Sequence, residues 1–199
     1  MNKLSQTPKT NIQQPLRICL IGFMGAGKTV TAQVLAEELT GADWIDLDEF
    51  IEVRENRHIG QMIENLGENA FREIETDALR EVIKLEGNMI LALGGGTWTI
   101  EENREVIEAA NYIPVWLDAS FELCWKRISE AKENRPLARL KTKTQQLFSS
   151  RRKIYQTAKI KVKVSKDKTP GDVALGILKL ISQPKPKRPK PIDKTGVSR

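Results

Sequence analysis

Residues 22–29 read GFMGAGKT, with an apolar run before them at Leu16–Ile21 and a helical pattern after them at Thr29–Thr40. The stretch matches G-x-x-x-x-G-K-[ST], a phosphate loop between a strand and a helix. Its glycines let backbone N–H groups converge on phosphate oxygens, and the following helix adds the positive end of its dipole. Lys28 can reach the β- and γ-phosphates, and the Thr29 hydroxyl can ligate Mg²⁺. The stretch therefore predicts a nucleotide site but does not identify the acceptor.

The chain on both sides of this loop alternates between apolar runs and helical patterns. The runs with strand character are Leu16–Ile21, Asp43–Leu47, Asn88–Leu93, Tyr112–Leu117 and Ile160–Val164. The helical patterns are Thr29–Thr40, Asp48–Asn56, Asn69–Leu85, Glu101–Ala110, Phe121–Glu130, Thr144–Thr157 and Pro170–Ile181. Nearly continuous apolar strands are typical of a parallel sheet covered on both faces. The alternation predicts a three-layer α/β/α domain with ligands at the carboxyl ends of its strands.

Composition limits the possible classes of protein. Of the 199 residues, 40% are hydrophobic and 29% are charged, which is ordinary for one folded domain and unlike a disordered chain. The two cysteines, Cys19 and Cys124, exclude a disulfide-rich scaffold, and with His58 as the single histidine we expect no metal cluster. We expect a cytoplasmic protein, because the sequence has neither a membrane-spanning apolar run nor a secretory signal.

The net charge of +6 is concentrated at the two ends of the chain. Residues 183–199 hold six lysines and arginines, four prolines and a single aspartate, and residues 1–14 hold two lysines and no acidic residue. Both ends bury too little apolar surface to offset the entropy of ordering, so we expect disordered tails around a domain at residues 15–182. Because that domain is close to neutral, the basic charge is weak evidence for a nucleic-acid-binding face.

Two carboxylates, Asp46 and Asp48, close the second predicted strand. Side chains alternate across a strand, so both project to the same side, at a sheet edge that would also hold the phosphate loop. One carboxylate can then organise Mg²⁺ through water, and the other can take a proton from an acceptor hydroxyl. An equally supported interpretation is that Asp48 only caps the following helix.

Three consecutive glycines, Gly94, Gly95 and Gly96, follow the third predicted strand. Such a run loses much conformational entropy on folding, and a tight turn alone rarely needs all three. The run favours a backbone that passes close to a ligand, with a flexible turn as the alternative. Trp98 follows it, and packing in the core is the more common role for such an indole than contact with a ligand.

Four arginines are candidate ligands for anions. Arg135 lies in a polar segment without clear periodicity, residues 129–144, which predicts a mobile lid that could carry it over a transferred phosphoryl group. Arg72 lies off the apolar stripe of its predicted helix and could instead pair with a glutamate at the surface. Arg151 and Arg152 both lie among apolar residues, and periodicity does not choose between them. Each of these arginines, taken alone, is more often a surface residue.

Taken in order, these motifs resemble the shikimate kinase family from about Leu16 to Val164. They are the phosphate loop, Asp46-x-Asp48, Gly67-Glu-x-x-Phe71-Arg72, Gly94-Gly-Gly96, Arg135-Pro-Leu137 and Arg151-x-x-x-Tyr155. The phosphate loop is shared by many enzymes, whereas the combination is much more specific. The resemblance implies a P-loop fold like that of nucleoside monophosphate kinases, with a five-stranded parallel sheet. It also implies transfer of the γ-phosphoryl group of ATP to the 3-hydroxyl of shikimate.

The resemblance also implies which residues hold the nucleotide. The phosphate-loop residues that would bind ATP are Gly25, Ala26, Gly27, Lys28, Thr29 and Val30. Thr29 and Asp46 would hold Mg²⁺, and Arg127 would pack on the adenine. Arg135 would reach the phosphates from the lid and, with Lys28, would take part in catalysis.

On the acceptor side, the resemblance implies that Asp48 binds the hydroxyl groups of shikimate and acts as the catalytic base. It implies that Arg72 and Arg151 pair with the shikimate carboxylate, and so prefers Arg151 to Arg152. The glycines from Gly94 to Gly96 would approach the substrate through their backbone. We expect a monomer with a small-molecule substrate and no membrane or nucleic-acid partner.

Two other functions remain open. A related small-molecule kinase, such as one for gluconate, would share the phosphate loop without needing Arg72 and Arg151 beside three glycines. A nucleic-acid-associated ATP-binding protein would use the basic C-terminal tail. The chain also departs from the family pattern at Thr97-Trp98, where a small or aliphatic pair is more usual, and an indole there could narrow or reshape the acceptor pocket.

Overall fold

Five parallel strands form one sheet, and their bounds are β1 (Arg17–Ile21), β2 (Ala42–Asp46), β3 (Asn88–Ala92), β4 (Ile113–Ala119) and β5 (Ile160–Val164). Their order is β2-β3-β1-β4-β5, so β1 lies in the middle with Ile18 paired to Ile90 of β3 and to Ile113 of β4. Ile18, Cys19 and Leu20 are fully buried, which explains why this strand is apolar at successive positions. The central strand leads directly into the phosphate loop.

The computed structural model describes residues 15–131 and 140–182. Both expected tails, residues 1–14 and 183–199, lie outside this part of the chain. So do residues 132–139, which hold Arg135 and the middle half of the segment expected to form a lid.

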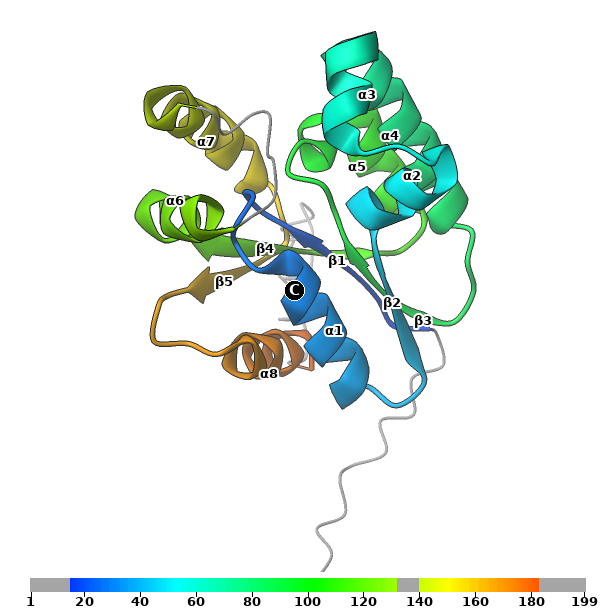
Figure 1. Ribbon diagram of the computed structural model, residues 1–199. Helices are drawn as coiled ribbons and strands as arrows, with labels where there is room; N and C mark the ends of the chain where they lie inside the picture. The colour runs from blue at the N-terminus through cyan, green and yellow to red at the C-terminus, as the bar shows by residue number, and fades with distance from the viewer. Residues whose placement is uncertain (1–14, 132–139, 183–199) are drawn as a thin grey trace, which may run out of the picture.

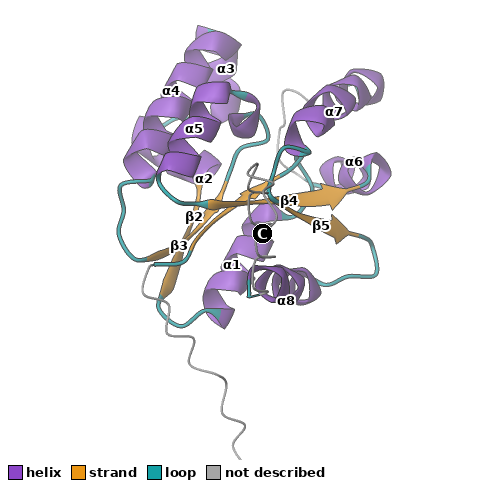
Figure 2. Cartoon of the chain, turned by 180° about the vertical axis from the view of Figure 1, so that it is seen from behind, coloured by secondary structure: helices purple, strands orange, loops and turns teal. Residues whose placement is uncertain are grey.

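Helices cover both faces of the sheet (Figures 1 and 2). They are α1 (Lys28–Glu38), α2 (Leu47–Glu55), α3 (Ile59–Leu66), α4 (Glu68–Val82), α5 (Glu101–Ala109), α6 (Phe121–Glu130), α7 (Lys141–Tyr155) and α8 (Pro170–Ile181), with a short 3₁₀ helix, η1 (Thr97–Thr99). Helices α1 and α8 pack together on one face, and the others lie on the opposite side in two groups, α2–α5 and α6–α7. The three-layer architecture expected from the sequence is therefore confirmed.

The elements agree closely with those expected, since every predicted strand and helix is present with ends shifted by at most three residues. Helix α8 begins and ends where predicted, because Pro170 occupies its first turn and Thr169 forms a capping box with Asp172. Helix α7 begins at Lys141 and α6 continues to Glu130, so regular helix extends into both ends of the expected lid. Among the described residues, every helix is too short or too polar to cross a bilayer.

Helix α3 was not predicted from the sequence. It is short, contains Gly60, and starts at His58 without a side-chain cap, so the usual start signal is missing. Glu52 belongs to the preceding helix, α2, and its side chain accepts a hydrogen bond from the backbone N–H of Ile59 at 2.8 Å. This contact takes the place of the missing N-cap. The helix packs against α4 and thereby completes the group α2–α5.

Candidate active site

The phosphate loop joins β1 to α1 and has the backbone that phosphate binding requires. Gly22, Gly25 and Gly27 all have positive φ angles, of 147°, 78° and 95°. A β-carbon at Gly25 would also lie only 2.8 Å from the carbonyl oxygen of Cys124 on α6, so glycine is needed there for space as well. Gly27 is the N-cap of α1, and it has no side chain that could bind the first N–H groups of the helix. These N–H groups point toward the loop and can bind phosphate oxygens.

The ammonium group of Lys28 lies over the same loop. Its Nζ donates hydrogen bonds to the carbonyl oxygens of Gly22 at 3.1 Å and Phe23 at 3.3 Å. The positive charge is thus held at the concave side of the loop, where a phosphate chain would follow the backbone N–H groups.

Thr29 and Asp46 meet at the carboxyl end of the sheet. The hydroxyl of Thr29 donates a hydrogen bond to Oδ2 of Asp46, while Oδ1 of Asp46 accepts one from the backbone N–H of Asp48 at 2.9 Å. Asp46 is therefore the N-cap of α2. The interpretation of Asp48 as the cap of this helix is therefore wrong, and its role as a base stays a prediction.

Asp48 has an unusual acidity. The pKa of its carboxyl group is raised from the usual 3.8 to about 7. Burial is the largest cause, and the nearby carboxylates of Asp46 and Glu75 act in the same direction. Lys28 and Arg72 oppose this shift but do not cancel it. A carboxyl group that titrates near neutral pH, within electrostatic reach of Lys28, has the acidity expected of a general base.

Arg72 lies directly against the third glycine of the turn after β3. Its guanidinium donates to Oε2 of Glu75 at 2.8 Å and to Oε1 of Glu68 at 3.0 Å, and a β-carbon at Gly96 would overlap it. Burial disfavours the positive charge, but Glu75 and Glu68 outweigh this effect and raise the pKa of Arg72. Arg72 does pair with glutamates, as a surface residue would, yet one of them, Glu75, is fully buried.

Arg151 approaches the same turn from α7. It is 7% exposed, and a β-carbon at Gly95 would lie 3.3 Å from its Nη1. Burial lowers the pKa of Arg151, and the neighbouring guanidinium of Arg72 lowers it further. No carboxylate in the described part of the chain forms an ion pair with Arg151, whose guanidinium lies close to that of Arg72 at the glycine turn. Such a pair suits an anionic ligand.

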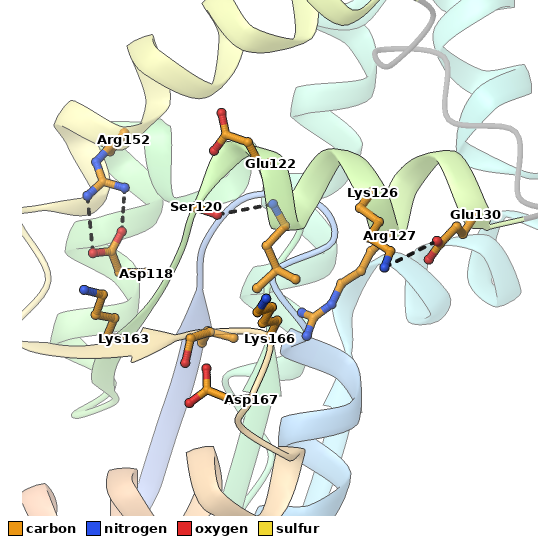
Figure 3. A pocket seen from close by; sticks show the side chains of 13 residues that line it. Asp118, Ser120, Glu122, Lys126, Arg127, Glu130, Arg152, Lys163, Lys166 and Asp167 are labelled. Atoms are coloured by element: carbon orange, nitrogen blue, oxygen red, sulfur yellow. Dashed lines mark hydrogen bonds and ion pairs between the residues drawn. The ribbon is translucent and has the colours of Figure 1, made fainter.

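Arg152, the alternative to Arg151, points away from the glycine turn. It binds both carboxylate oxygens of Asp118, at 2.6 and 3.3 Å (Figure 3). Its guanidinium also lies over the rings of Trp116 and Phe148. The structure thus separates two adjacent arginines that periodicity could not distinguish. Arg151 faces the glycines, and Arg152 links α7 to β4 through Asp118.

A cavity of about 730 Å³ lies between α6 and the segment that follows β5 (Figure 3). Arg127 lines it and donates from Nη1 to the carbonyl oxygen of Gly25 at 3.0 Å, which fixes the guanidinium beside the phosphate loop. Lys166 and Asp167 line the opposite side. The cavity has the size for a nucleoside next to the phosphates.

The three glycines bring the acceptor candidates together. A β-carbon at Gly94 would lie 2.6 Å from Oδ1 of Asp48 and 2.7 Å from Oε1 of Glu75, so each glycine is crowded by a charged side chain. The close packing of these side chains is therefore one reason for glycine at the turn, and the approach of its backbone to a ligand stays a prediction.

Trp98 is buried and donates to Thr157 at 3.2 Å, so its indole packs in the core. Sequence reasoning missed the buried position of Glu75, for which the only signal was its spacing of three residues from Arg72.

A phosphate loop whose lysine lies within electrostatic reach of a carboxylate is typical of P-loop kinases that act on small molecules, and the sheet order and helical layers are those of the nucleoside monophosphate kinase fold. Within that class, the family model for shikimate kinase matches residues 24–182. The chain therefore belongs to the shikimate kinase family.

Individual relatives agree with this assignment. The shikimate kinase of Lactococcus lactis subsp. cremoris (strain MG1363) is 40% identical over 161 residues, which are 80% of this chain and 94% of that protein. The structure of shikimate kinase from Acinetobacter baumannii in complex with shikimate has a TM-score of 0.77 and 34% identity, covering 85% of this chain and 93% of that one. For the crystal structure of shikimate kinase from Aquifex aeolicus, the TM-score is 0.69 at 34% identity, with 83% and 96% covered.

Proposed function

We propose that this chain is an ATP-dependent shikimate kinase, which transfers the γ-phosphoryl group of ATP to the 3-hydroxyl of shikimate and releases ADP. The observation that carries this proposal is the meeting of Arg72 and Arg151 at the glycine turn, within electrostatic reach of Asp48. A small hydroxylated carboxylic acid needs one cationic subsite for its carboxylate and one basic group for its hydroxyl, and this turn offers both.

The triphosphate is held by the loop at residues 22–29. Backbone N–H groups and the start of α1 contact the phosphate oxygens, and Lys28 leaves its carbonyl partners to reach the β- and γ-phosphates. Gly25, Ala26, Gly27 and Val30 belong to the same binding loop. The nucleoside occupies the cavity beside Arg127, whose planar guanidinium can stack on the base. Arg135 completes this side in our proposal, although it lies outside the described residues.

Mg²⁺ is expected beside Thr29 and Asp46. A hydroxyl and a carboxylate next to a phosphate loop are hard oxygen donors, and the described residues hold no cluster of three or more acidic or histidine ligands that would bind a metal alone. This donor set fits an ion that keeps several waters and shares its shell with phosphates. When bound, Mg²⁺ would neutralise negative charge that develops on the phosphates.

The reaction itself is an in-line displacement. Asp48, as the carboxylate, accepts the proton of the 3-hydroxyl while the oxygen of that hydroxyl forms a bond to the γ-phosphorus. The bond between the γ-phosphorus and the bridging oxygen breaks at the same time, and its electrons leave with ADP. Arg72 and Arg151 hold the carboxylate at the far end of the ring, so that the hydroxyl is oriented toward the phosphate.

We further infer a monomeric, cytoplasmic enzyme. The nucleotide elements and the acceptor elements belong to one domain with one parallel sheet, which supports a site within a single copy. Both cysteines, Cys19 and Cys124, are free and buried, which agrees with a reducing compartment.

An acceptor panel tests the proposed function. Purified full-length protein is incubated with MgATP and either shikimate, D-gluconate or AMP, and the phosphorylated products are identified by mass spectrometry and ³¹P NMR. We expect a single phosphate on the 3-hydroxyl of shikimate and background product with the other two. Efficient phosphorylation of gluconate or AMP, with none of shikimate, would refute the proposal.

A further inference from the structure

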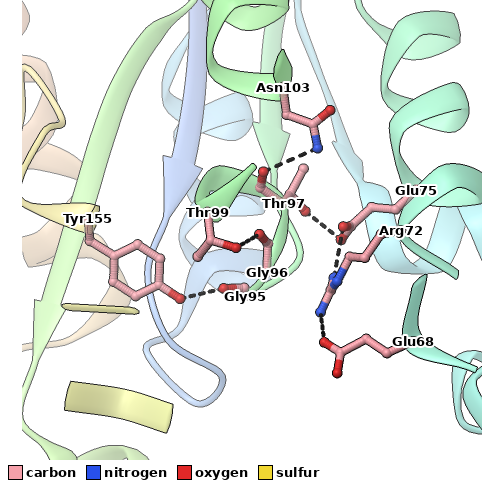
Figure 4. A network of polar contacts seen from close by, with 9 residues as sticks. All are labelled: Glu68, Arg72, Glu75, Gly95, Gly96, Thr97, Thr99, Asn103 and Tyr155. Carbon is pink, nitrogen blue, oxygen red and sulfur yellow. Dashed lines mark hydrogen bonds and ion pairs between the residues drawn. The ribbon is translucent and has the colours of Figure 1, made fainter. Parts of the chain in front are cut away.

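Thr97 is the first residue after the glycine turn and is fully buried at the start of η1. Its hydroxyl donates a hydrogen bond of 2.6 Å to Oε1 of Glu75, which is also fully buried (Figure 4). The other oxygen of the same carboxylate, Oε2, accepts from Nη1 of Arg72 at 2.8 Å. One carboxylate thus joins the buried hydroxyl of Thr97 to the guanidinium of Arg72.

A fully buried carboxylate must have hydrogen-bond partners for its oxygens, because leaving one unpaired carries the full cost of desolvation. Arg72 satisfies Oε2 of Glu75, and Thr97 satisfies Oε1. Together the two contacts fix both the position and the plane of the carboxylate. Without the hydroxyl, Glu75 would have only the arginine to orient it and could rotate about its terminal torsion.

Thr97 is itself held firmly. Its carbonyl oxygen accepts a hydrogen bond of 3.2 Å from Nδ2 of Asn103, a fully buried residue on α5. Its hydroxyl oxygen also lies 3.0 Å from the point where Gly94 would carry a β-carbon. The line Asn103–Thr97–Glu75–Arg72 therefore runs from the packed core to the guanidinium beside Gly96, as Figure 4 shows.

The orientation of Arg72 depends on this line more than on its other partner. Its second ion pair is with Glu68, whose side chain is 50% exposed, so solvent weakens that contact and leaves it free to move. The pair with Glu75 is screened from water. Because the guanidinium also lies against Gly96, a small rotation of Glu75 would change the face that Arg72 presents to an anion.

We propose that Thr97 is a positioning residue for acceptor binding: its hydroxyl fixes the Glu75 carboxylate, which in turn aligns Arg72 with the acceptor carboxylate. Thr97 does not contact the acceptor in this account. The proposal rests on the proposed function, and it assigns a role to a position where the chain departs from the usual small or aliphatic residue of the family.

Steady-state kinetics of three variants test the proposal. Thr97→Val keeps the shape of the side chain and removes the hydroxyl, whereas Thr97→Ser keeps the hydroxyl. Thr76→Val is the matched control, since Thr76 is also buried and adjacent to Glu75 but makes none of the contacts of this line. For T97V we expect the KM for shikimate to rise roughly tenfold, as for the loss of a hydrogen bond to a charged group, with the KM for ATP unchanged within about twofold. T97S and T76V should keep the wild-type KM for shikimate.

A second measurement separates positioning from a general loss of structure. Calorimetry compares the binding of shikimate with that of its carboxamide, which cannot form an ion pair with Arg72. The weaker binding of T97V to shikimate should disappear with the carboxamide, for which wild type and T97V should have equal affinity. A loss of the same size with both ligands would overturn the proposal, because it would indicate a defect unrelated to the carboxylate.

The remaining outcomes are equally decisive. A T97V enzyme with wild-type KM for shikimate, or a T97S enzyme as impaired as T97V, overturns the inference while the proposed function stands. A wild-type enzyme that is inactive with shikimate overturns both. If T97V fails to fold, Thr97→Cys has a similar size and only a weak donor, and it must raise the KM for shikimate for the proposal to survive.

Discussion

The backbone of Gly95 lies against the guanidinium of Arg151: a β-carbon at that glycine would lie 3.3 Å from Nη1 of the arginine. The hydroxyl of Tyr155, one helical turn after Arg151, donates to the carbonyl oxygen of Gly95. Helix α7 is therefore fastened to the glycine turn at two points. This contact places the guanidinium of Arg151 beside Arg72, at the anion subsite that we propose.

The first prediction concerns that subsite. Arg151→Lys keeps a positive charge but loses the planar fork that can bind both oxygens of a carboxylate. We expect the KM for shikimate to rise by roughly 10- to 100-fold, with little change in the KM for ATP. Arg80→Lys is the matched control, because Arg80 is an exposed arginine of α4 that pairs with Asp77 and Glu102, and it should leave the KM for shikimate unchanged. A rise confined to the KM for ATP in R151K would show that the carboxylate assignment is wrong.

The second prediction concerns the glycine turn. Gly96→Ala would place a methyl group onto the guanidinium of Arg72, so the arginine must move. We expect weaker shikimate binding with ATP binding preserved, measured by calorimetry for each ligand separately. Gly171→Ala serves as a control, since a β-carbon there would meet only Thr169 at an ordinary 3.7 Å and should leave both affinities unchanged. Wild-type shikimate affinity in G96A would rule out a close approach of Arg72 to the acceptor.

The third prediction concerns the base. Asp48→Asn should retain ATP binding and lose roughly 10²–10⁴ in kcat, the usual size of a lost acid–base contribution. In the wild type, kcat/KM for shikimate should rise with pH and level off above the raised pKa of about 7, because only the carboxylate accepts a proton. Near-normal turnover in D48N, or a pH profile that falls across this range, would remove Asp48 from the role.

The fourth prediction follows from the same pKa. Because the folded protein raises the pKa of Asp48 from 3.8 to about 7, the folded state binds more protons at this site than the unfolded state does between these values. The contribution of Asp48 to stability is therefore present at about pH 4 and is lost as the pH rises through about 7. Urea unfolding should show D48N gaining stability relative to wild type as the pH increases from about 4 to about 8. A constant difference across this range would contradict a raised pKa.

Local patterns predict most of this fold. The phosphate loop is a contiguous motif, and α8 carries its own capping box and an N-terminal proline, so both can be found without tertiary information. The order of the strands cannot be predicted from local patterns, because it depends on which strands pair across the sheet. Helix α3 lacked a cap of its own, although the spacing of Ile59, Met62 and Ile63 gave a signal that periodicity alone could have used.

Some residues of the candidate site can likewise be predicted from local sequence, and others depend on tertiary contacts. Asp46, Asp48 and the three glycines can be found in the sequence because a pair of carboxylates and an unbroken run of glycines each follow an apolar strand. The choice between Arg151 and Arg152 needs the rotation of α7 about its axis, which is fixed by distant partners such as Asp118 and Gly95. The burial of Glu75 likewise depends on Thr97, which is remote in sequence. Charged residues are ordinarily solvated, so nothing local marks a buried one.

A crystal structure of the full chain with ADP, Mg²⁺ and shikimate tests the central claim most directly. We predict that the shikimate carboxylate lies within hydrogen-bond distance of the guanidinium groups of Arg72 and Arg151, and that the 3-hydroxyl faces Asp48 on the side of the phosphate loop. Shikimate bound away from the glycine turn, or with its carboxylate directed at Lys28, would contradict the account.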